Sequence, residues 1–485
     1  MLPATITEAA RRFTDRTAYV TDAGWALTYA DVDRLSDEAA VGLARRGLRT
    51  GDVVALVLPP GAEYLVAYCA AAKLGAITAG VNDRLSERER TAVLEVAEPK
   101  LVLDAGEFPA AGSVDGVLRD LRVPGDAPPA LPDDPERPVA IIFTSGTTGL
   151  PKGALYCNKQ LAFITRTDVG NAWDGGGRSF TGTSFAHLGF MTKLAGNLRR
   201  GGTNFIMSRW RAQDALELVA RERMATVAGV PSQLALMLRQ PDFDGYDLSS
   251  VKFIVAGGGP ITPGLADEAR RRFDAKLATR YSCTEAGIGL GTGFDDPEED
   301  AVVSVGRPHA SVELALLDDD DRPVAGGEVG QVCLRSPAVM SGYWHDAAAT
   351  RAAFTRDGFV RTGDLGWLDD RGRLRLVGRS KEMYVRGGYN VYPVEVESVL
   401  STHPGVAAVA VVPRPDDVMG EIGVAVVVPR APDRVPTLAD LRAYAAPHLA
   451  AYKLPEAVRV VDALPLTVGE KVDRRALADE VKQVE

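Results

Sequence analysis

The chain has 485 residues, which is long for one domain, so we expect two or more. Its composition, 46% hydrophobic and 25% charged, is that of an ordinary globular protein. The net charge of −10 argues against a nucleic-acid binder and against binding to anionic membrane surfaces. No apolar run approaches the ~20 residues that span a bilayer, so no membrane span is expected.

The four cysteines lie far apart and form no Cys-x-x-Cys pair, which disfavours a disulfide framework or a zinc site. The five histidines are equally scattered, so a histidine metal site is not expected. The N-terminus lacks the basic start and apolar core of a signal peptide. We therefore expect a cytoplasmic protein.

Strand and helix patterns alternate along the first part of the chain. A turn precedes an amphipathic helix in 27–47, for which Asp31 or Ser36 is the expected cap. Next come an apolar strand in 53–58, a helix in 63–73, a strand in 75–81 and a short strand in 101–103. This alternation predicts a layered α/β domain with mostly parallel sheets.

The stretch 139–153 changes abruptly from an apolar strand to hydroxyls and glycines. Bare glycine backbone lets N–H groups approach an anion closely, and a lysine adds a mobile positive charge. It is not a Walker A loop, because Gly153 follows Lys152 where Ser or Thr should stand. The residues expected to hold polyphosphate are Thr144, Ser145, Gly146, Thr147, Thr148, Gly149 and Lys152.

Two further polar segments follow strand-like runs. Tyr281 to Glu285 offers a ring for stacking on a base, two hydroxyls and a carboxylate that can hold Mg²⁺. The run Gly257, Gly258, Gly259 and Pro260 ends the strand expected in 251–256. Ligands of α/β sheets bind at the carboxyl ends of strands, although glycines there can also serve only a tight turn.

Near residue 380 the pattern of predicted strands and helices changes. Asp364 is suited to accept the hydroxyls of a ribose, and Arg379 can add a fixed charge, although the two could equally form a surface ion pair. Strands in 406–412 and 422–428 and a helix in 438–446 predict a small α+β domain. We expect an N-terminal domain over 1–379 and a C-terminal domain over 380–485.

Together these segments resemble the adenylate-forming superfamily, which contains acyl- and aryl-CoA synthetases, nonribosomal-peptide adenylation domains and beetle luciferases. The resemblance covers nearly the whole chain, with several motifs in the family's order. It implies ATP, Mg²⁺ and coenzyme A as cofactors. It implies that Tyr281 flanks adenine, Thr284 binds the α-phosphate, Glu285 binds Mg²⁺, and Asp364 and Arg379 bind the ribose side.

The resemblance also assigns five features of the acyl, thiol and adenine sites. His187 takes the aromatic-gate position, and Lys471, in the segment Pro465 to Arg474, is the catalytic lysine. Lys381 is the hinge about which the C-terminal domain rotates. Gly387 and Gly388 would line the path of the thiol, and Gly258, Gly259 and Pro260 would wall the adenine and acyl pocket.

Three positions depart from the family's pattern. Ser282 replaces a glycine, Ser184 replaces a proline before the gate, and Glu470 stands where a glycine usually precedes the catalytic lysine. A carboxylate at 470 could alter the loop or pair with the lysine and weaken its charge.

The leading expectation is an ATP-dependent carboxylic acid–CoA ligase. The alternatives are an acyl-AMP ligase that loads the phosphopantetheine of a separate carrier protein, a non-catalytic binder of adenylate or acyl ligands, and a luciferase-like oxygenase, which nothing specific favours. Ala186 and Leu188 flank the gate without an acidic residue, which argues against an α-amino acid. A homodimer is left open.

We expect a bulky, largely apolar acid, with a tight aromatic slot as the rival. The glycines expected to leave room near the pocket are Gly189, Gly257, Gly258, Gly259, Gly287, Gly289, Gly291 and Gly293.

Overall fold

The computed structural model describes residues 1–144, 151–431 and 434–482. Its first sheet has the order β5-β3-β4-β6-β7, and all neighbours are parallel except β6 and β7. The strands are β3 (Val53–Val57), β4 (Ile77–Gly80), β5 (Leu101–Asp104), β6 (Pro138–Thr144) and β7 (Lys152–Cys157). Because β3 and β4 are buried along their whole length, they read as continuous apolar runs.

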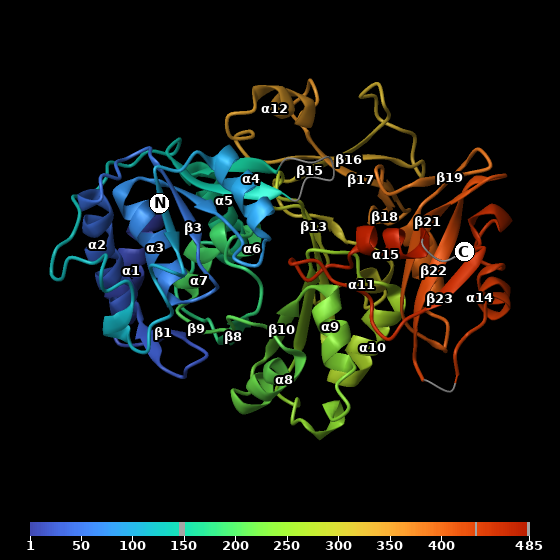
Figure 1. The fold of residues 1–485 in the computed structure, drawn as a ribbon, viewed down its shortest axis with the longest axis horizontal. Coiled ribbons are helices and arrows are strands. Elements are labelled where there is room, and N and C mark those ends of the chain that lie inside the picture. Colours follow the sequence, from blue (N-terminus) through green and yellow to red (C-terminus); the bar gives the residue numbers. More distant parts are fainter. Residues whose placement is uncertain (145–150, 432–433, 483–485) are drawn as a thin grey trace.

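Helices cover this sheet at the N-terminal end of the molecule, drawn in blue to green in Figure 1. They are α1 (Leu2–Phe13), α2 (Tyr29–Arg45), α3 (Ala62–Leu74), α4 (Glu87–Ala97), α5 (Asn158–Val169), α6 (Leu188–Met191) and α7 (Leu194–Arg200). The expected cap of α2 is wrong: Thr28 caps it by accepting from the Asp31 N–H, while Asp31 completes the capping box. Ser36 lies inside the helix instead.

A second sheet of order β2-β1-β9-β8 joins the first layer to the next. Its strands are β1 (Thr17–Val20), β2 (Ala26–Thr28), β8 (Arg178–Thr181) and β9 (Thr203–Ile206). The third sheet has the order β10-β11-β12-β13-β14, in which β10, β11 and β12 are parallel. It contains β10 (Thr226–Gly229), β11 (Phe253–Gly257), β12 (Lys276–Tyr281), β13 (Leu290–Gly291) and β14 (Arg307–Pro308).

The third sheet carries α8 (Ala212–Arg221), α9 (Pro231–Leu238), α10 (Pro263–Phe273) and the short α11 (Asp300–Val303). A fourth, antiparallel sheet follows, with α12 (Ala347–Ala353) inserted in it. Its strands are β15 (Glu313–Leu317), β16 (Gly330–Arg335), β17 (Val360–Leu368) and β18 (Leu374–Arg379). The strands β15 and β16 pair antiparallel across the acidic turn of 318–321.

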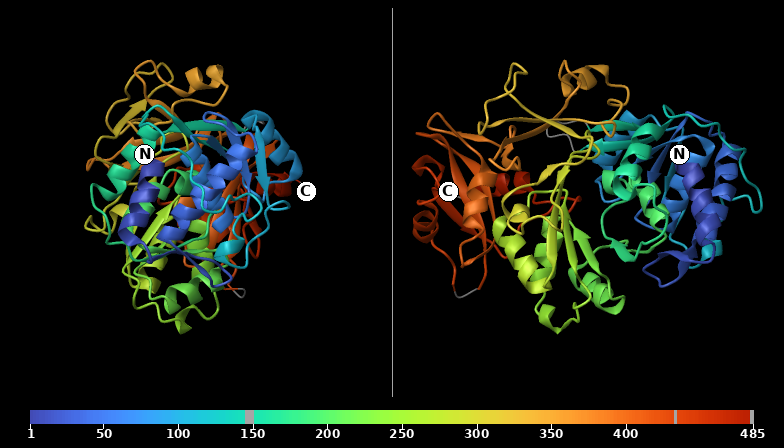
Figure 2. Two further views of the ribbon diagram at one scale, coloured as in Figure 1. Left: turned by 90° about the vertical axis from the view of Figure 1, so that its left-hand side faces the viewer. Right: turned by 180° about the vertical axis from the view of Figure 1, so that it is seen from behind.

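The last sheet lies at the opposite end of the molecule from the first, in red in Figure 1 and seen from behind in Figure 2. It joins β19 (Tyr384–Arg386), β20 (Tyr389–Val391), β21 (Val406–Asp416), β22 (Gly420–Pro429) and β23 (Ala457–Val460). Helices α13 (Pro393–Leu400), α14 (Leu438–Ala445) and α15 (Arg474–Lys482) pack on it. Two hydrophobic clusters made only of residues after 380 form its core.

The α/β class is confirmed, with largely parallel sheets first and a smaller mixed α+β part last. Within the described residues, no helix combines the length and apolar character needed to cross a membrane.

Candidate active site

Two loops lie side by side at the carboxyl ends of the parallel strands β10 and β11. Gly258 has φ +79, so the chain turns sharply directly after β11 in a conformation that favours glycine. A Cβ at Gly259 would lie 3.7 Å from Cδ of Pro231, which begins α9 after β10. The loop of Gly258, Gly259 and Pro260 therefore lies beside the loop after β10, at the edge of the sheet where α/β folds bind ligands.

The candidate phosphate loop connects antiparallel strands. Thr144 at the end of β6 pairs with Lys152 at the start of β7. The predicted residues Ser145, Gly146, Thr147, Thr148 and Gly149 lie outside the described residues. The Lys152 ammonium lies 5.2 Å from the ring centroid of Tyr343, so the loop's cation is held over an aromatic face.

Tyr343 connects this lysine to the predicted magnesium ligand. Its hydroxyl donates to Oε1 of Glu285 at 2.7 Å. Burial and the Glu285 carboxylate both raise the pKa of Tyr343, so it stays a donor at neutral pH. The structure thus brings together Thr144, Lys152 and Glu285, and adds Tyr343, which the sequence alone did not point to.

Thr284 and Glu285 are fixed by their backbone. The buried Tyr156 on β7 donates its hydroxyl to the Thr284 carbonyl at 2.6 Å, and the Met340 N–H donates to the Glu285 carbonyl at 2.9 Å. These bonds fix the backbone from which both side chains project. Serine at 282 is accommodated, with its hydroxyl donating to the Cys283 carbonyl.

Asp364 on β17 is buried and is bonded from two sides. The Tyr281 hydroxyl donates to one carboxylate oxygen at 2.7 Å, and Nε of Arg379 donates to the other at 3.0 Å. Burial and the Asp364 charge raise the pKa of Tyr281. The three predicted nucleoside residues therefore form one cluster, which includes the Asp–Arg ion pair that the sequence left as an alternative.

Lys471 lies beside this cluster on a tight turn. The Thr467 N–H donates to the Lys471 carbonyl at 2.7 Å, and the Glu470 N–H donates to the Thr467 carbonyl at 2.9 Å. Desolvation by the surrounding walls and the Arg379 guanidinium lower the pKa of Lys471, while Asp364 acts in the opposite direction. In Figure 1 the red segment before α15 reaches from the C-terminal sheet into the centre of the molecule.

The gate residue His187, at the start of α6, lies within electrostatic range of Lys471. Desolvation and the Lys471 charge lower the pKa of His187 to about 4, so the ring is neutral at physiological pH. Nδ2 of Asn82 lies 3.3 Å from the His187 Nε2. Asn82 directly follows the buried residues of β4, and its place at a strand end is the signal that would have found it.

Glu470 does not pair with Lys471 in this structure. Its Oε1 lies 2.8 Å from Nη1 of Arg84, and its carbonyl accepts from the Ser232 hydroxyl. The expectation that Glu470 weakens the charge of Lys471 by pairing with it is therefore not met. No local motif points to Arg84, because its partner is 386 positions away.

The predicted thiol-path glycines are not part of this cluster. Gly387 and Gly388 have φ +54 and +85 and form the exposed turn between β19 and β20. Lys381, the predicted hinge, lies between the end of β18 and the start of β19. This arrangement presents Lys471, rather than that turn, to the strand ends.

Three glycines do not leave room for a substrate, contrary to the expectation. A Cβ at Gly287 would collide with the Ala338 carbonyl, one at Gly289 with the Tyr281 carbonyl, and one at Gly291 with the Thr279 carbonyl. These positions need glycine because two backbones pack closely. Gly189 has open space around it, and a Cβ at Gly258 or Gly259 would meet only side-chain atoms.

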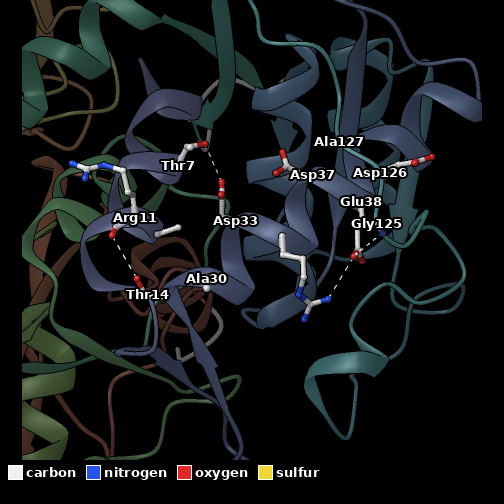
Figure 3. A pocket seen from close by; sticks show the side chains of 12 residues that line it. Thr7, Arg11, Thr14, Ala30, Asp33, Asp37, Glu38, Gly125, Asp126 and Ala127 are labelled. Carbon is white, nitrogen blue, oxygen red and sulfur yellow. Dashed lines mark hydrogen bonds and ion pairs between the residues drawn. The ribbon is translucent and has the colours of Figure 1, made fainter.

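A cavity of about 650 Å³ lies elsewhere, between α1, α2 and the segment 125–127 (Figure 3). Its carboxylates already have cationic partners: Lys73 binds Asp33 and Asp37, and Arg122 binds Glu38. These pairs tie α2 to its neighbours, and we assign the cavity no chemistry. In the part of the chain that the structure describes, no group of three or more His, Cys, Asp or Glu side chains could hold a metal ion.

Comparisons with known proteins identify the family of the chain. The family model "AMP-binding enzyme" matches residues 6–344, and the model "AMP-binding enzyme C-terminal domain" matches residues 395–471. A fatty acid–[acyl-carrier-protein] ligase of Streptomyces coeruleorubidus is 32% identical, over 94% of this chain and 92% of that protein. A feruloyl-CoA synthase of Amycolatopsis is 33% identical, over 95% of each.

Among solved structures, the amide bond synthetase of Marinactinospora thermotolerans superposes with a TM-score of 0.86 at 27% identity, covering 100% of both chains. The matches span almost the full length of this chain and of its relatives. The chain therefore belongs to the AMP-binding, adenylate-forming enzyme family and is an AMP-forming ligase of the acid–thiol type.

Proposed function

We propose that the chain is an ATP-dependent carboxylic acid–CoA ligase that forms an acyl-adenylate and then a thioester. The observation that carries this proposal is that Lys471 lies within electrostatic range of both the gate His187 and the Asp364–Arg379 pair. A lysine there can bridge a carboxylate on the gate side and a phosphate on the nucleoside side. We assign the N-terminal domain to 1–379 and the mobile C-terminal domain to 380–485.

In the first half-reaction a carboxylate oxygen attacks the α-phosphorus of ATP, and pyrophosphate leaves. Positioning and cationic stabilisation supply most of the catalysis in such a transfer. Lys471 would bridge the carboxylate and the α-phosphate, and Thr284 would bind a phosphate oxygen. The loop from Thr144 to Lys152 would hold the pyrophosphate.

The nucleoside would lie against Tyr281, with its ribose hydroxyls on Asp364. Glu285 would hold Mg²⁺, which neutralises phosphate charge when bound. Its carboxylate fits that role, because the Tyr343 hydroxyl bonds only Oε1 and magnesium needs few protein carboxylates.

In the second half-reaction the thiol sulfur attacks the acyl carbonyl carbon, and AMP leaves. We propose that the C-terminal domain rotates about Lys381 between the two halves. Rotation would withdraw Lys471 and bring the turn of Gly387 and Gly388 to the site. The exposure of that turn supports the proposal, because the adenylating arrangement gives it no other role.

We propose a bulky, largely apolar acid as the substrate. The gate is a neutral histidine flanked by Ala186 and Leu188, so nothing beside it offers a charge for a substrate ammonium. The open space at Gly189 supports the proposal, while Gly287, Gly289 and Gly291 no longer do. The feruloyl-CoA relative supports an aromatic member of this class.

The test is pyrophosphate release with ATP and Mg²⁺ against short, long, aromatic and polycyclic carboxylic acids, with and without CoA. Release that depends on one class of acid is expected, together with acyl-CoA detected by mass. Release with α-amino acids alone would contradict the proposal.

A second candidate is loading of a separate carrier protein, which the Streptomyces relative favours by its named activity. The same adenylation would occur, and the acceptor thiol would be a phosphopantetheine. Acid-dependent pyrophosphate release without acyl-CoA formation, followed by acylation of a loaded carrier protein, would select this candidate.

A further inference from the structure

Glu470 holds an unfavourable backbone conformation directly before Lys471. Its φ is +60, in the left-handed region where an L side chain is disfavoured and glycine is not. Backbone strain of this kind persists only where the surrounding structure enforces it, and it points to a role for the residue. The question is therefore what the Glu470 side chain does there.

Glu470 ties the lysine turn to the N-terminal part of the chain at two points. Its carboxylate is 2.8 Å from the Arg84 guanidinium, and its side chain is only 17% exposed. Its carbonyl accepts from Ser232, which lies on α9 at the carboxyl end of β10. Both partners belong to the body from which the C-terminal domain would rotate, so both contacts exist only in the arrangement that presents Lys471.

Arg84 is in turn linked to the acid gate. Its backbone N–H donates to Oδ1 of Asn82 at 3.0 Å, and the other end of the same amide lies 3.3 Å from the His187 Nε2. Asn82 is buried, so the amide has little freedom to turn away. A continuous series of contacts thus runs from Glu470 through Arg84 and Asn82 to His187.

We propose that Arg84 is a positioning residue that docks the Lys471 turn through Glu470, and that Asn82 couples this docking to the acid gate. The proposal rests on the proposed role of Lys471 in adenylation. Arg84 itself touches no reacting group. Its effect is to hold the lysine where carboxylate and α-phosphate meet, and to release it when the domain rotates.

The chain offers a matched control. Arg430 and Glu268 form another ion pair between the same two parts, also 2.8 Å long, with side chains 41% and 19% exposed. That pair joins the end of β22 to α10 and has no link to the gate. Glu268→Gln therefore removes an ion pair between the domains without touching the Lys471 turn.

The experiment compares Arg84→Ala, Glu470→Gln, Arg84→Lys and Glu268→Gln in the full chain with an acid that the wild type activates. Arg84→Ala and Glu470→Gln should lower kcat of acid-dependent pyrophosphate release by about tenfold to a hundredfold, as misplacement of a catalytic group does. The KM for ATP and thioester formation from supplied acyl-AMP should stay at wild-type values. Arg84→Lys should recover part of kcat, because only one guanidinium nitrogen contacts Glu470.

Two outcomes would overturn the proposal: wild-type kcat in both Arg84→Ala and Glu470→Gln, or an equal loss in both half-reactions. A loss in Glu268→Gln as large as that in Arg84→Ala would also overturn it, because the effect would then be general domain docking. A wild type that is silent with every acid would count against the proposed function instead.

A second readout needs no substrate. Amide hydrogen exchange across 466–472 should speed up in Arg84→Ala and stay unchanged in Glu268→Gln. Equal exchange in Arg84→Ala and the wild type would overturn the docking role, whether or not the enzyme is active.

Discussion

At the scale of single residues, Lys471 brings an exposed ammonium to the neighbourhood of the Asp364–Arg379 pair. The pKa of Lys471 is lowered by desolvation and by Arg379, and Asp364 opposes that shift. The ammonium can therefore stabilise negative charge on a ligand bound beside the Asp364–Arg379 pair. This balance suits a group that must act in one half-reaction and leave in the other.

Lys471→Ala should abolish adenylation and spare thioester formation. Loss of one contact to developing phosphate charge typically costs about 10²–10³ in rate. Pyrophosphate release measures the first half, and acyl-CoA formed from supplied acyl-AMP measures the second. Lys482→Ala, at the end of α15, is the control and should match the wild type in both. Equal loss in both halves would reject the role assigned to Lys471.

His187 should make the stability of the protein depend on pH. Burial lowers its pKa to about 4, whereas an unfolded histidine titrates near 6.5. As pH falls through that window the unfolded state binds a proton that the folded state does not. The free energy of unfolding should therefore fall by at most about 3 kcal/mol from this residue.

Urea denaturation at pH 7 and pH 4.5 checks this contribution. Between pH 7 and pH 4.5, the free energy of unfolding should fall less in His187→Gln than in the wild type. The control is His345→Gln, whose side chain is 55% exposed. An identical loss in the wild type and His187→Gln would show that the buried ring contributes nothing to the pH dependence.

At the scale of elements, two helices hold the domains together end to end. The Ser401 carbonyl, just past the end of α13, lies so close to Gly264 in the first turn of α10 that a Cβ there would collide with it. The negative end of one helix dipole thus faces the positive end of the other, which is favourable. Glycine at 264 is required for this approach, not for the helix.

Gly264→Ala should therefore weaken the adenylating arrangement without unfolding α10, since alanine is the better helix former. We expect acid-dependent pyrophosphate release to fall by about tenfold or more, as for a misplaced catalytic group. Thioester formation from supplied acyl-AMP should persist. Gly245→Ala, where a Cβ meets nothing within 4 Å, is the control. Undiminished pyrophosphate release in Gly264→Ala would contradict this account of the contact.

At the scale of the whole molecule, one connection must absorb the proposed rotation. Lys381 lies between two sheets with separate cores, so a change in its backbone angles turns one core against the other. Hinges are short segments of this kind that take up large dihedral changes.

Lys381→Pro should impair thioester formation and spare adenylation, whereas Lys471→Ala should impair adenylation and spare thioester formation. Proline fixes φ near −65°, so the domain is held in one arrangement. We expect pyrophosphate release in the first turnover to remain within a few-fold of the wild type and thioester formation to fall by about 10² or more. Lys381→Ala, which keeps the backbone free, serves as the comparison. Unchanged thioester formation in Lys381→Pro would place the hinge elsewhere.

Much of this architecture could be predicted from local sequence patterns. The strands β3, β4 and β6 are apolar runs, and each lies where its run predicts a strand. Local patterns also located Tyr281, Asp364 and Arg379, because each motif carries its chemistry within a few residues. The pairing of β6 with β7, which makes the phosphate loop a hairpin, is set by the sheet and leaves no such local signal.

Contacts between distant segments explain what was missed. Tyr343 approaches Glu285 across 58 positions, and Arg84 approaches Glu470 across 386. The sequence alone does not distinguish a glycine that leaves space in a pocket from a glycine that lets a neighbouring backbone pack closely. Gly287, Gly289 and Gly291 therefore suggested space where the structure has close packing.

The left-handed backbone at Glu470 lowers the stability of the fold, whereas the carboxylate of this residue supports turnover. Selection for stability and selection for activity therefore favour different residues at this position. A glycine there would relieve about 1 kcal/mol of strain and remove the carboxylate that Arg84 binds. Selection for a robust fold alone would drift position 470 toward glycine, and selection for product would retain glutamate. A library randomised at codon 470 can be sorted separately for stability and for product formation. The pool sorted for stability should become enriched in glycine, and the pool sorted for product should become enriched in glutamate. Loss of glutamate from both pools would mean that the strained residue brings no benefit.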